Sequence, residues 1–189
     1  MVVVLFHSMF GLRPVELAAA ERLCAGGHEV VLPDLFDGAT VPGDLDAGFA
    51  LMERIGWDTI VGRARRSTAD VPGDAVLGGF SMGVGVIGAL WPERLGAAGV
   101  FCLHAPALVP DGIRAGTPVE LHVGTQDGFA PPDQVAAFRQ SADRAGARAG
   151  VHTYPGVGHY FTDESLADYD AAATADTWAH VDAMLAALT

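Results

Sequence analysis

Ser81 lies in the pentapeptide Gly79-Phe80-Ser81-Met82-Gly83, which has the G-x-S-x-G spacing of a serine nucleophile. A strand-like run at residues 74–77 precedes it, and an apolar helix-like run at residues 84–90 follows it. A serine on such a sharp strand-to-helix turn exposes its hydroxyl, and glycines are needed on both sides because side chains there would collide. The pattern therefore predicts that Ser81 is a nucleophile.

A nucleophilic serine needs a histidine as general base and an acid that orients the histidine. In α/β proteins of this kind the order along the chain is serine, acid, histidine, each placed after the carboxyl end of a strand. Asp127 follows the apolar run at 119–123, and His159 follows the last strand-like run at 151–154. The sequence predicts a catalytic triad of Ser81, Asp127 and His159.

Other residues compete for these roles. Asp127 is followed by glycine and is also compatible with an ordinary turn, whereas Asp133, in Pro131-Pro132-Asp133, is typical of a helix start. His7 and His104 end strands and can line the site, but their place in the chain order excludes them as the base. The remaining histidines are expected in strands or on a helix, away from the active edge: His28, His122, His152 and His180.

An oxyanion formed during acyl transfer needs two converging backbone N–H donors. Met82 directly follows the serine and begins a helix, so its N–H is one candidate. The second donor usually comes from the loop after the first core strand, here residues 7–11, and we assign it to the Met9 N–H. The same loop is also compatible with an ordinary strand-to-helix turn.

The elements that must position these residues alternate between strand and helix. Strand-like runs are expected at 2–6, 28–32, 74–77, 99–103, 119–123 and 151–154, and helices at 14–25, 45–66, 84–90, 132–145 and the C-terminus, where Trp178, Val181, Leu185 and Leu188 share one face. This alternation predicts an α/β fold, with a mostly parallel sheet covered by helices on both faces. Without linkers or repeats, residues 1–189 are expected to form a single domain, and residues 105–118 at most a flap.

Composition excludes several classes of partner. A formal charge of −12, with only 11 lysines and arginines together, argues against a nucleic-acid partner. Residues 1–6 are too short and lack the basic flank of a secretory signal, and no segment is long enough to cross a membrane, so we expect a cytoplasmic protein without a membrane partner. Cys24 and Cys102 are expected to be reduced and buried, although the sequence leaves open whether either approaches the site.

No cofactor or metal is expected from the motifs. The glycines of residues 83–88 match G-x-G-x-x-G, but the first already lies at the helix start, and the next strand ends in Leu103-His104 and not in an acidic residue. The histidines are scattered, without C-x-x-C or H-E-x-x-H spacing, and so predict no metal site.

These motifs together resemble the dienelactone hydrolase family of α/β hydrolases, and the likeness covers nearly the whole chain. It rests on the turn Met9-Phe10-Gly11, the segment 31–35, the pentapeptide around Ser81, residues 124–127 and Gly158-His159-Tyr160-Phe161. The resemblance implies an α/β-hydrolase fold without a cap domain.

The chain departs from that family's pattern at three positions. The resemblance implies a cysteine where this chain has Ser81, and a first-turn glutamate, which helps to control the cysteine, where it has Ser8. The two changes agree, because a serine activated by His159 needs no carboxylate to control a thiol. Members that act on dienelactone bind the substrate carboxylate with arginines. One such arginine is expected four residues after the histidine, where this chain has Asp163, so an anionic substrate is disfavoured there.

The sequence thus predicts a serine hydrolase that cleaves small esters, lactones or related acyl compounds through an acyl-enzyme. A thioesterase or a peptidase with the same triad, a non-catalytic small-molecule-binding protein on this fold, and a flavodoxin-like nucleotide-binding protein are the alternatives. The natural substrate and the choice between monomer and homodimer stay open. The substrate pocket is expected to include residues that flank the triad, although the aromatic ones are equally compatible with the core: Ser8, Phe10, Phe80, His104, Tyr160 and Phe161.

Overall fold

The computed structural model describes residues 1–41 and 43–189. Within these residues a single sheet contains β1 (Val2–Phe6), β2 (Glu29–Val31), β3 (Val76–Phe80), β4 (Val100–Leu103), β5 (Pro118–Gly124) and β6 (Arg148–Tyr154). The strand order is β2-β1-β3-β4-β5-β6, and every neighbouring pair is parallel. The predicted α/β-hydrolase type of fold is confirmed. All carboxyl ends therefore lie at one edge of the sheet, where residues after different strands meet.

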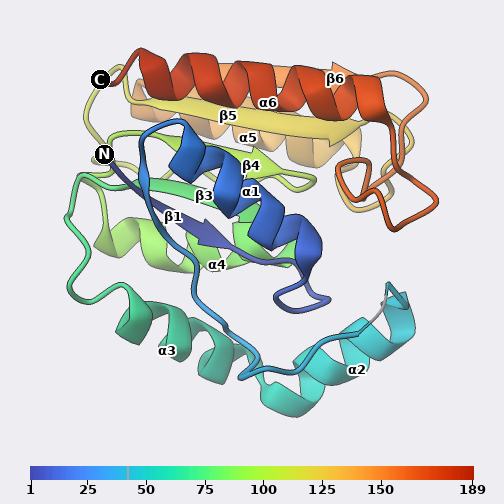
Figure 1. The fold of residues 1–189 in the computed structure, drawn as a ribbon. Coiled ribbons are helices and arrows are strands. Elements are labelled where there is room, and N and C mark those ends of the chain that lie inside the picture. Colours follow the sequence, from blue (N-terminus) through green and yellow to red (C-terminus); the bar gives the residue numbers. More distant parts are fainter. Residues whose placement is uncertain (42) are drawn as a thin grey trace.

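Helices cover both faces of this sheet (Figure 1). They are α1 (Pro14–Ala25), α2 (Leu45–Ile55), α3 (Trp57–Ser67), α4 (Met82–Leu90), α5 (Pro132–Ala145) and α6 (Ala171–Ala186), with a short 3₁₀ turn at Trp91–Glu93. Residues of α1 and α6 pack with one set of strand side chains, and residues of α2 to α5 pack with the other set. The alternation of strand side chains thus builds two apolar layers, one on each face of the sheet.

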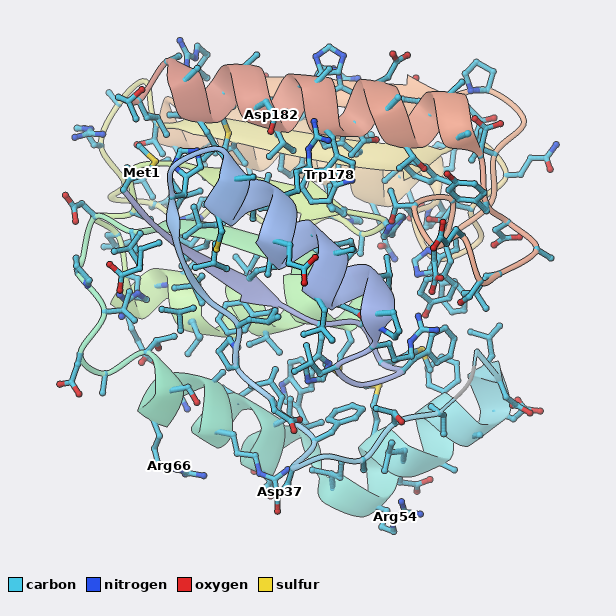
Figure 2. The ribbon with its side chains drawn as sticks, in the orientation of Figure 1. Met1, Asp37, Arg54, Arg66, Trp178 and Asp182 are labelled. Carbon is cyan, nitrogen blue, oxygen red and sulfur yellow. The ribbon has the colours of Figure 1, made fainter. Side chains whose placement is uncertain are left out.

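Trp178 of α6 lies between that helix and α1 (Figure 2). The guanidinium of Arg22 stands 5.7 Å from the centre of its ring, and Arg22 also pairs with Asp182 at 2.5 Å. The predicted apolar face of the last helix is confirmed, because Trp178, Val181 and Leu185 are buried in the same cluster.

Two predicted elements differ from the structure. The helix expected over residues 45–66 is two helices, because Gly56 adopts φ 83° and ψ 135°, which ends α2 and starts α3 in a new direction. The strand expected at 74–77 instead begins at Val76 and continues to Phe80. Gly78 and Gly79 weaken its strand-like pattern, but a Cβ on Gly78 would stand 2.0 Å from the Phe101 ring, so glycine is required there by packing.

The prediction for the two cysteines is correct for Cys102 and wrong for Cys24. Cys102 is buried in β4, and burial raises its thiol pKa to about 12. Cys24 is exposed, because α1 turns Ala19 and Leu23 toward the sheet and the residue after Leu23 points away from it. Among the described residues, none of the helices combines the length and apolar character needed to cross a membrane.

Candidate active site

The turn that carries Ser81 is as sharp as its sequence predicts. Ser81 connects β3 to α4 with φ 49° and ψ −106°, a left-handed backbone that is strained for any residue except glycine. A Cβ on Gly79 would stand 2.7 Å from the carbonyl carbon of Gly83, and one on Gly83 would stand 2.4 Å from the carbonyl oxygen of Phe6. Both glycines are therefore required, because backbone occupies the space that a side chain would need.

The three residues predicted as a triad lie in hydrogen-bond contact. The hydroxyl oxygen of Ser81 is 2.8 Å from Nε2 of His159, and Nδ1 of His159 is 2.6 Å from Oδ2 of Asp127. The backbone N–H of Phe129 donates to the other carboxylate oxygen of Asp127 at 2.8 Å. With Nδ1–H donating to the carboxylate, Nε2 is left to accept the proton of the serine hydroxyl.

The loops after β5 and β6 hold Asp127 and His159 together. The N–H of Thr125 donates to the carbonyl of Tyr154, and the N–H of Gln126 donates to the carbonyl of Val157. Gly124 permits this approach, because a Cβ there would stand 2.2 Å from the Val157 carbonyl oxygen. The two loops are thus joined by backbone hydrogen bonds, which fixes the distance between Asp127 and His159.

Both candidate oxyanion donors have unused N–H groups. Met82 is the first residue of α4, and the first N–H groups of a helix have no partner within it. In the loop after β1, the N–H groups of Ser8, Phe10 and Gly11 donate to Glu16, to the Ser8 hydroxyl and to the Ser8 carbonyl, respectively. The N–H of Met9 makes no hydrogen bond within the described part of the chain.

This geometry agrees with comparisons to known proteins. The model of the dienelactone hydrolase family matches residues 1–188. The chain belongs to the dienelactone hydrolase family. A curated relative, the hydrolase pyvD of Aspergillus violaceofuscus, is 31% identical over 143 residues, and this match covers 69% of the present chain. The chain spans 58% of the length of that relative.

Solved structures of the same fold include enzymes of the dienelactone hydrolase type. A dienelactone hydrolase-like promiscuous phosphotriesterase from metagenomic libraries superposes with a TM-score of 0.78 at 21% identity, covering 99% of this chain and 86% of its own. A thermophilic esterase of Thermogutta terrifontis superposes with a TM-score of 0.71 at 15% identity, covering 99% and 81%. At these identities the likeness establishes the fold.

Within this dienelactone hydrolase fold, the buried carboxylate of Glu16 contacts the loop between β1 and α1, a contact that the sequence did not predict. Glu16 of α1 accepts hydrogen bonds from the Ser8 hydroxyl at 2.8 Å, the Ser8 N–H at 3.2 Å and the Arg13 N–H at 3.0 Å. Burial raises the pKa of Glu16, and the hydrogen bonds from Ser8 oppose this rise. The Ser8 hydroxyl therefore points toward α1 and serves the loop, and sequence reasoning missed Glu16 because it lies inside a helix pattern.

Asp163 also has a partner that the sequence did not reveal. Its carboxylate pairs with the guanidinium of Arg13, and the two side chains are only 5% and 9% exposed. Arg13 lies in addition 4.8 Å from the centre of the Phe10 ring. The position at which dienelactone-specific members are expected to carry a substrate-binding arginine is therefore one half of an internal ion pair.

Of the predicted pocket residues, Tyr160, Phe10 and His104 lie near His159, whereas Phe80 and Phe161 belong to separate packed clusters. Tyr160 borders the triad, with its ring centre 4.4 Å from that of His159, and Phe10 packs behind it at 4.7 Å. His104 lies 5.7 Å from the His159 ring, but it is buried and its Nε2 is 2.8 Å from the Thr162 hydroxyl. Among these residues, only Tyr160 lines a cavity beside the triad.

The prediction that Phe80 and Phe161 line the substrate pocket needs correction. Phe80 packs in the layer under α1 and α6, near Trp178, because its side chain lies on the face of the sheet opposite to α4. Phe161 is fully buried in a separate cluster with Tyr154 and Val157. Flanking a catalytic residue in sequence does not place a side chain beside it, since successive residues point in different directions.

A cavity of about 500 Å³ lies beside His159. Its lining includes His159, Tyr160, Phe129 and Leu45, of which Phe129 is 45% exposed and has its ring centre 4.8 Å from that of His159. Sequence reasoning missed Phe129, although its place two residues after Asp127 was a signal. A second cavity, of about 370 Å³, lies between α1, α6 and residues 162–165. His159 lines the first cavity, whereas none of Ser81, Asp127 and His159 lines the second, so we take the first cavity as the candidate substrate site.

Proposed function

We propose that the protein is a serine hydrolase that cleaves small esters, lactones or related acyl compounds. The observation that carries this proposal is the continuous hydrogen-bonded line from the Ser81 hydroxyl through the His159 imidazole to the Asp127 carboxylate, at 2.8 and 2.6 Å. Membership of the dienelactone hydrolase family supports the reaction class.

In the proposed mechanism, Ser81 Oγ forms a bond to the substrate carbonyl carbon while His159 Nε2 takes the hydroxyl proton. Asp127 accepts the Nδ1–H bond of His159 and so stabilises the imidazolium that forms. The negative charge on the former carbonyl oxygen is held by the N–H groups of Met82 and Met9. When the tetrahedral intermediate collapses, the carbon–oxygen bond to the alcohol breaks, and the alcohol leaves with the proton from His159.

Water then releases the acyl group by the same two steps, with water as the nucleophile and Ser81 as the leaving group. His159 removes a proton from water, the resulting hydroxide attacks the acyl carbon, and Ser81 regains its proton as the ester bond to the enzyme breaks. The charge that develops is again on one oxygen, so the same two N–H groups serve both halves of the reaction.

The substrate is proposed to be small and without negative charge near the reacting carbonyl. Arg13, a cationic side chain that contacts Phe10, is already paired with Asp163. The cavity beside His159 is lined by Tyr160, Phe129, Asp168 and Asp170, among others, and receives no arginine or lysine from the described residues. A free carboxylate on the substrate would find no partner there.

Hydrolysis of p-nitrophenyl acetate by the wild type and by Ser81→Ala tests the proposal. We expect Ser81→Ala to lose at least about 10³-fold in kcat/KM, because removal of a triad member leaves only binding and oxyanion stabilisation. Ser67→Ala, a change of an exposed serine at the end of α3, is the matched control and should keep full activity.

Labelling by a fluorophosphonate probe complements the kinetic measurement. The wild type and Ser67→Ala should be labelled once, and Ser81→Ala should not be labelled. Unchanged turnover by Ser81→Ala would refute the assignment, whereas labelling without turnover of esters would point to a thioester or peptide substrate. Absence of both labelling and turnover in the wild type would favour a non-catalytic binding protein.

A further inference from the structure

Four side chains that can bind metals lie on the face of β5 and β6 that packs against α6, and none of them belongs to the proposed triad: Glu120, His122, His152 and His180. Glu120 and His122 alternate along β5, so they point to the same face of the sheet. His152 stands directly opposite His122 in the parallel pair, and His180 of α6 stacks on His152 with ring centres 3.8 Å apart. Each of Glu120, His122 and His152 offers a ligand atom within 4.8 Å of the others.

His122 provides an independent observation that points to a ligand. The side chain is fully buried, and its Nδ1 lies 3.0 Å from the hydroxyl of Tyr154. Its Nε2 is also buried but has no hydrogen-bond partner within the described residues. If Nδ1–H donates to the Tyr154 oxygen, Nε2 carries an unused lone pair, which is how most metal-bound histidines are oriented.

The backbone makes room for the carboxylate of this cluster. Glu120 pairs with Gly150 across the two strands, and a Cβ on Gly150 would stand 2.0 Å from Oε2 of Glu120. The carboxylate instead lies over Gly150, and its Oε2 is 2.6 Å from Nε2 of His152. Glycine at this position thus lets Glu120 reach the histidine on the next strand.

Solvent can reach the cluster from one side. The side chains of His152 and Glu120 are 23% and 18% exposed, and His180 of α6 is exposed. A cation therefore has a route to the buried His122 past His152. The overall charge of −12 favours the approach of a cation.

We propose that Glu120, His122 and His152 bind a divalent transition-metal ion of the zinc class. Two imidazoles and one carboxylate are a ligand set that zinc prefers, and His180 or water completes four-coordination. Ligand atoms of tetrahedral zinc lie about 3.3 Å apart when each is about 2.0 Å from the ion. The ligand atoms, which lie up to 4.8 Å apart, must therefore move closer together. The His152 ring, whose plane is at 12° to that of His122, must also turn to face the ion.

Motif spacing did not reveal this site, and the prediction of no metal site rested on that spacing alone. Glu120 and His122 are two residues apart on one strand, and His152 lies thirty residues later at a matching register position. His152 was expected at a strand start, but β6 begins at Arg148, which places His152 within the strand and opposite His122. Register between parallel strands, which motifs do not encode, brings the ligands together.

Calorimetric titration of the chelator-treated whole protein with ZnCl₂ tests the proposal. We expect one ion per chain for the wild type and at least about tenfold weaker binding for His152→Ala and Glu120→Gln. Gly150→Ala should also weaken binding, because its methyl group displaces the Glu120 carboxylate without removing a ligand. His28→Ala removes a histidine outside the cluster and should bind as the wild type does. Circular dichroism verifies that each variant is folded.

His159→Ala distinguishes this site from binding at the triad, whose imidazole and carboxylate are the other plausible zinc ligands. Zinc binding that survives in His159→Ala and weakens in His152→Ala supports the proposal. Binding that is lost in His159→Ala, or that is unaffected by both His152→Ala and Glu120→Gln, overturns it. An absence of stoichiometric binding by the wild type overturns it as well.

Discussion

At the scale of single residues, Tyr160 combines burial with an unsatisfied polar group beside Ser81. Its hydroxyl is buried and has no partner with hydrogen-bond geometry among the described residues. Burial raises the pKa of Tyr160 to about 12, and an interaction with the Ser81 hydroxyl, short of hydrogen-bond geometry, opposes this rise. A buried unpaired hydroxyl destabilises a protein, so a role in the reaction would explain why it is there.

We predict that Tyr160→Phe lowers kcat for p-nitrophenyl acetate about tenfold. The phenolic O–H would no longer be able to donate a hydrogen bond toward the reacting oxygens, a contribution of about 1–2 kcal/mol. The thermal midpoint should stay the same or rise, because an unpaired buried group has been removed. Steady-state kinetics and thermal unfolding measure the two effects, and an unchanged kcat would exclude this role.

His7 is held in one neutral tautomer by the loop next to the site. Its Nδ1 lies 2.7 Å from the Ser8 carbonyl oxygen, to which it donates, and its Nε2 accepts from the Leu35 N–H at 3.0 Å. Protonation at Nε2 would break the second bond. Burial lowers the pKa of His7 below 6.5, and the hydrogen bond to Ser8 and the charge of Asp34 oppose this shift.

This lowered pKa predicts a pH-dependent stability. Above pH 6.5, His7 is neutral in both the folded and unfolded states, and its contribution is fully present. As the pH falls below 6.5, the unfolded chain takes up a proton that the folded chain does not, so stability is lost by up to about 1.4 kcal/mol per pH unit. Urea unfolding should therefore show a steeper loss between about pH 6.5 and pH 5 for the wild type than for His7→Gln. Equal slopes would contradict the assignment.

At the scale of elements, Gly83 and Gly88, two of the three glycines in α4, have opposite requirements. A Cβ on Gly83 would meet the Phe6 carbonyl oxygen at 2.4 Å, because the helix start lies directly on β1. A Cβ on Gly88 would meet only the Cβ of Ala107, at an ordinary 3.8 Å. The first glycine is needed for close packing, whereas the second has room for a methyl group.

Gly83→Ala is expected to lower the free energy of unfolding by about 3 kcal/mol and to remove most esterase activity. The reason is that the turn between β3 and α4, which carries Ser81, must move away from β1. Gly88→Ala in the same helix is the control and should raise the free energy of unfolding by about 0.5–1 kcal/mol, as alanine is the better helix former. Chemical denaturation measures both. Similar effects of the two changes would show that the contact with Phe6 is not tight.

The elements also show what a sequence can and cannot predict. The meeting of Ser81, Asp127 and His159 was predictable, because the carboxyl ends of parallel strands lie at one edge of the sheet, wherever the strands occur in the sequence. The directions of Phe80 and Phe161 were not, since they depend on which face of β3 the residue before Ser81 occupies and on how the loop turns after His159. The break at Gly56 was missed because the apolar pattern continues through it.

At the scale of the whole molecule, the pair Arg13–Asp163 joins the start of α1 to the segment after His159, residues 150 positions apart. Ser165 donates two hydrogen bonds to the other oxygen of Asp163, so the carboxylate is fully used. Such a partner cannot be read from a single sequence, because both residues also look like ordinary surface charges. That residues 1–189 make up one domain stays a prediction.

We predict that Asp163→Asn lowers the free energy of unfolding by about 3–5 kcal/mol, because it leaves the Arg13 charge buried without a counter-ion. Replacement of both residues by leucine should be less harmful than Asp163→Asn alone, since no isolated charge then remains. Urea denaturation of the two variants measures the difference. A double variant less stable than Asp163→Asn would show that the pair contributes through more than charge compensation.

The separation of 78 positions between Ser81 and His159 also matters while the protein is being made. A ribosome adds about 5–20 residues per second, so the nascent polypeptide carries its serine for roughly 4–16 s before the histidine exists. Under the proposed mechanism the growing chain is chemically silent during that interval. A chain truncated before His159 would lack the general base and, under the same mechanism, would not hydrolyse esters.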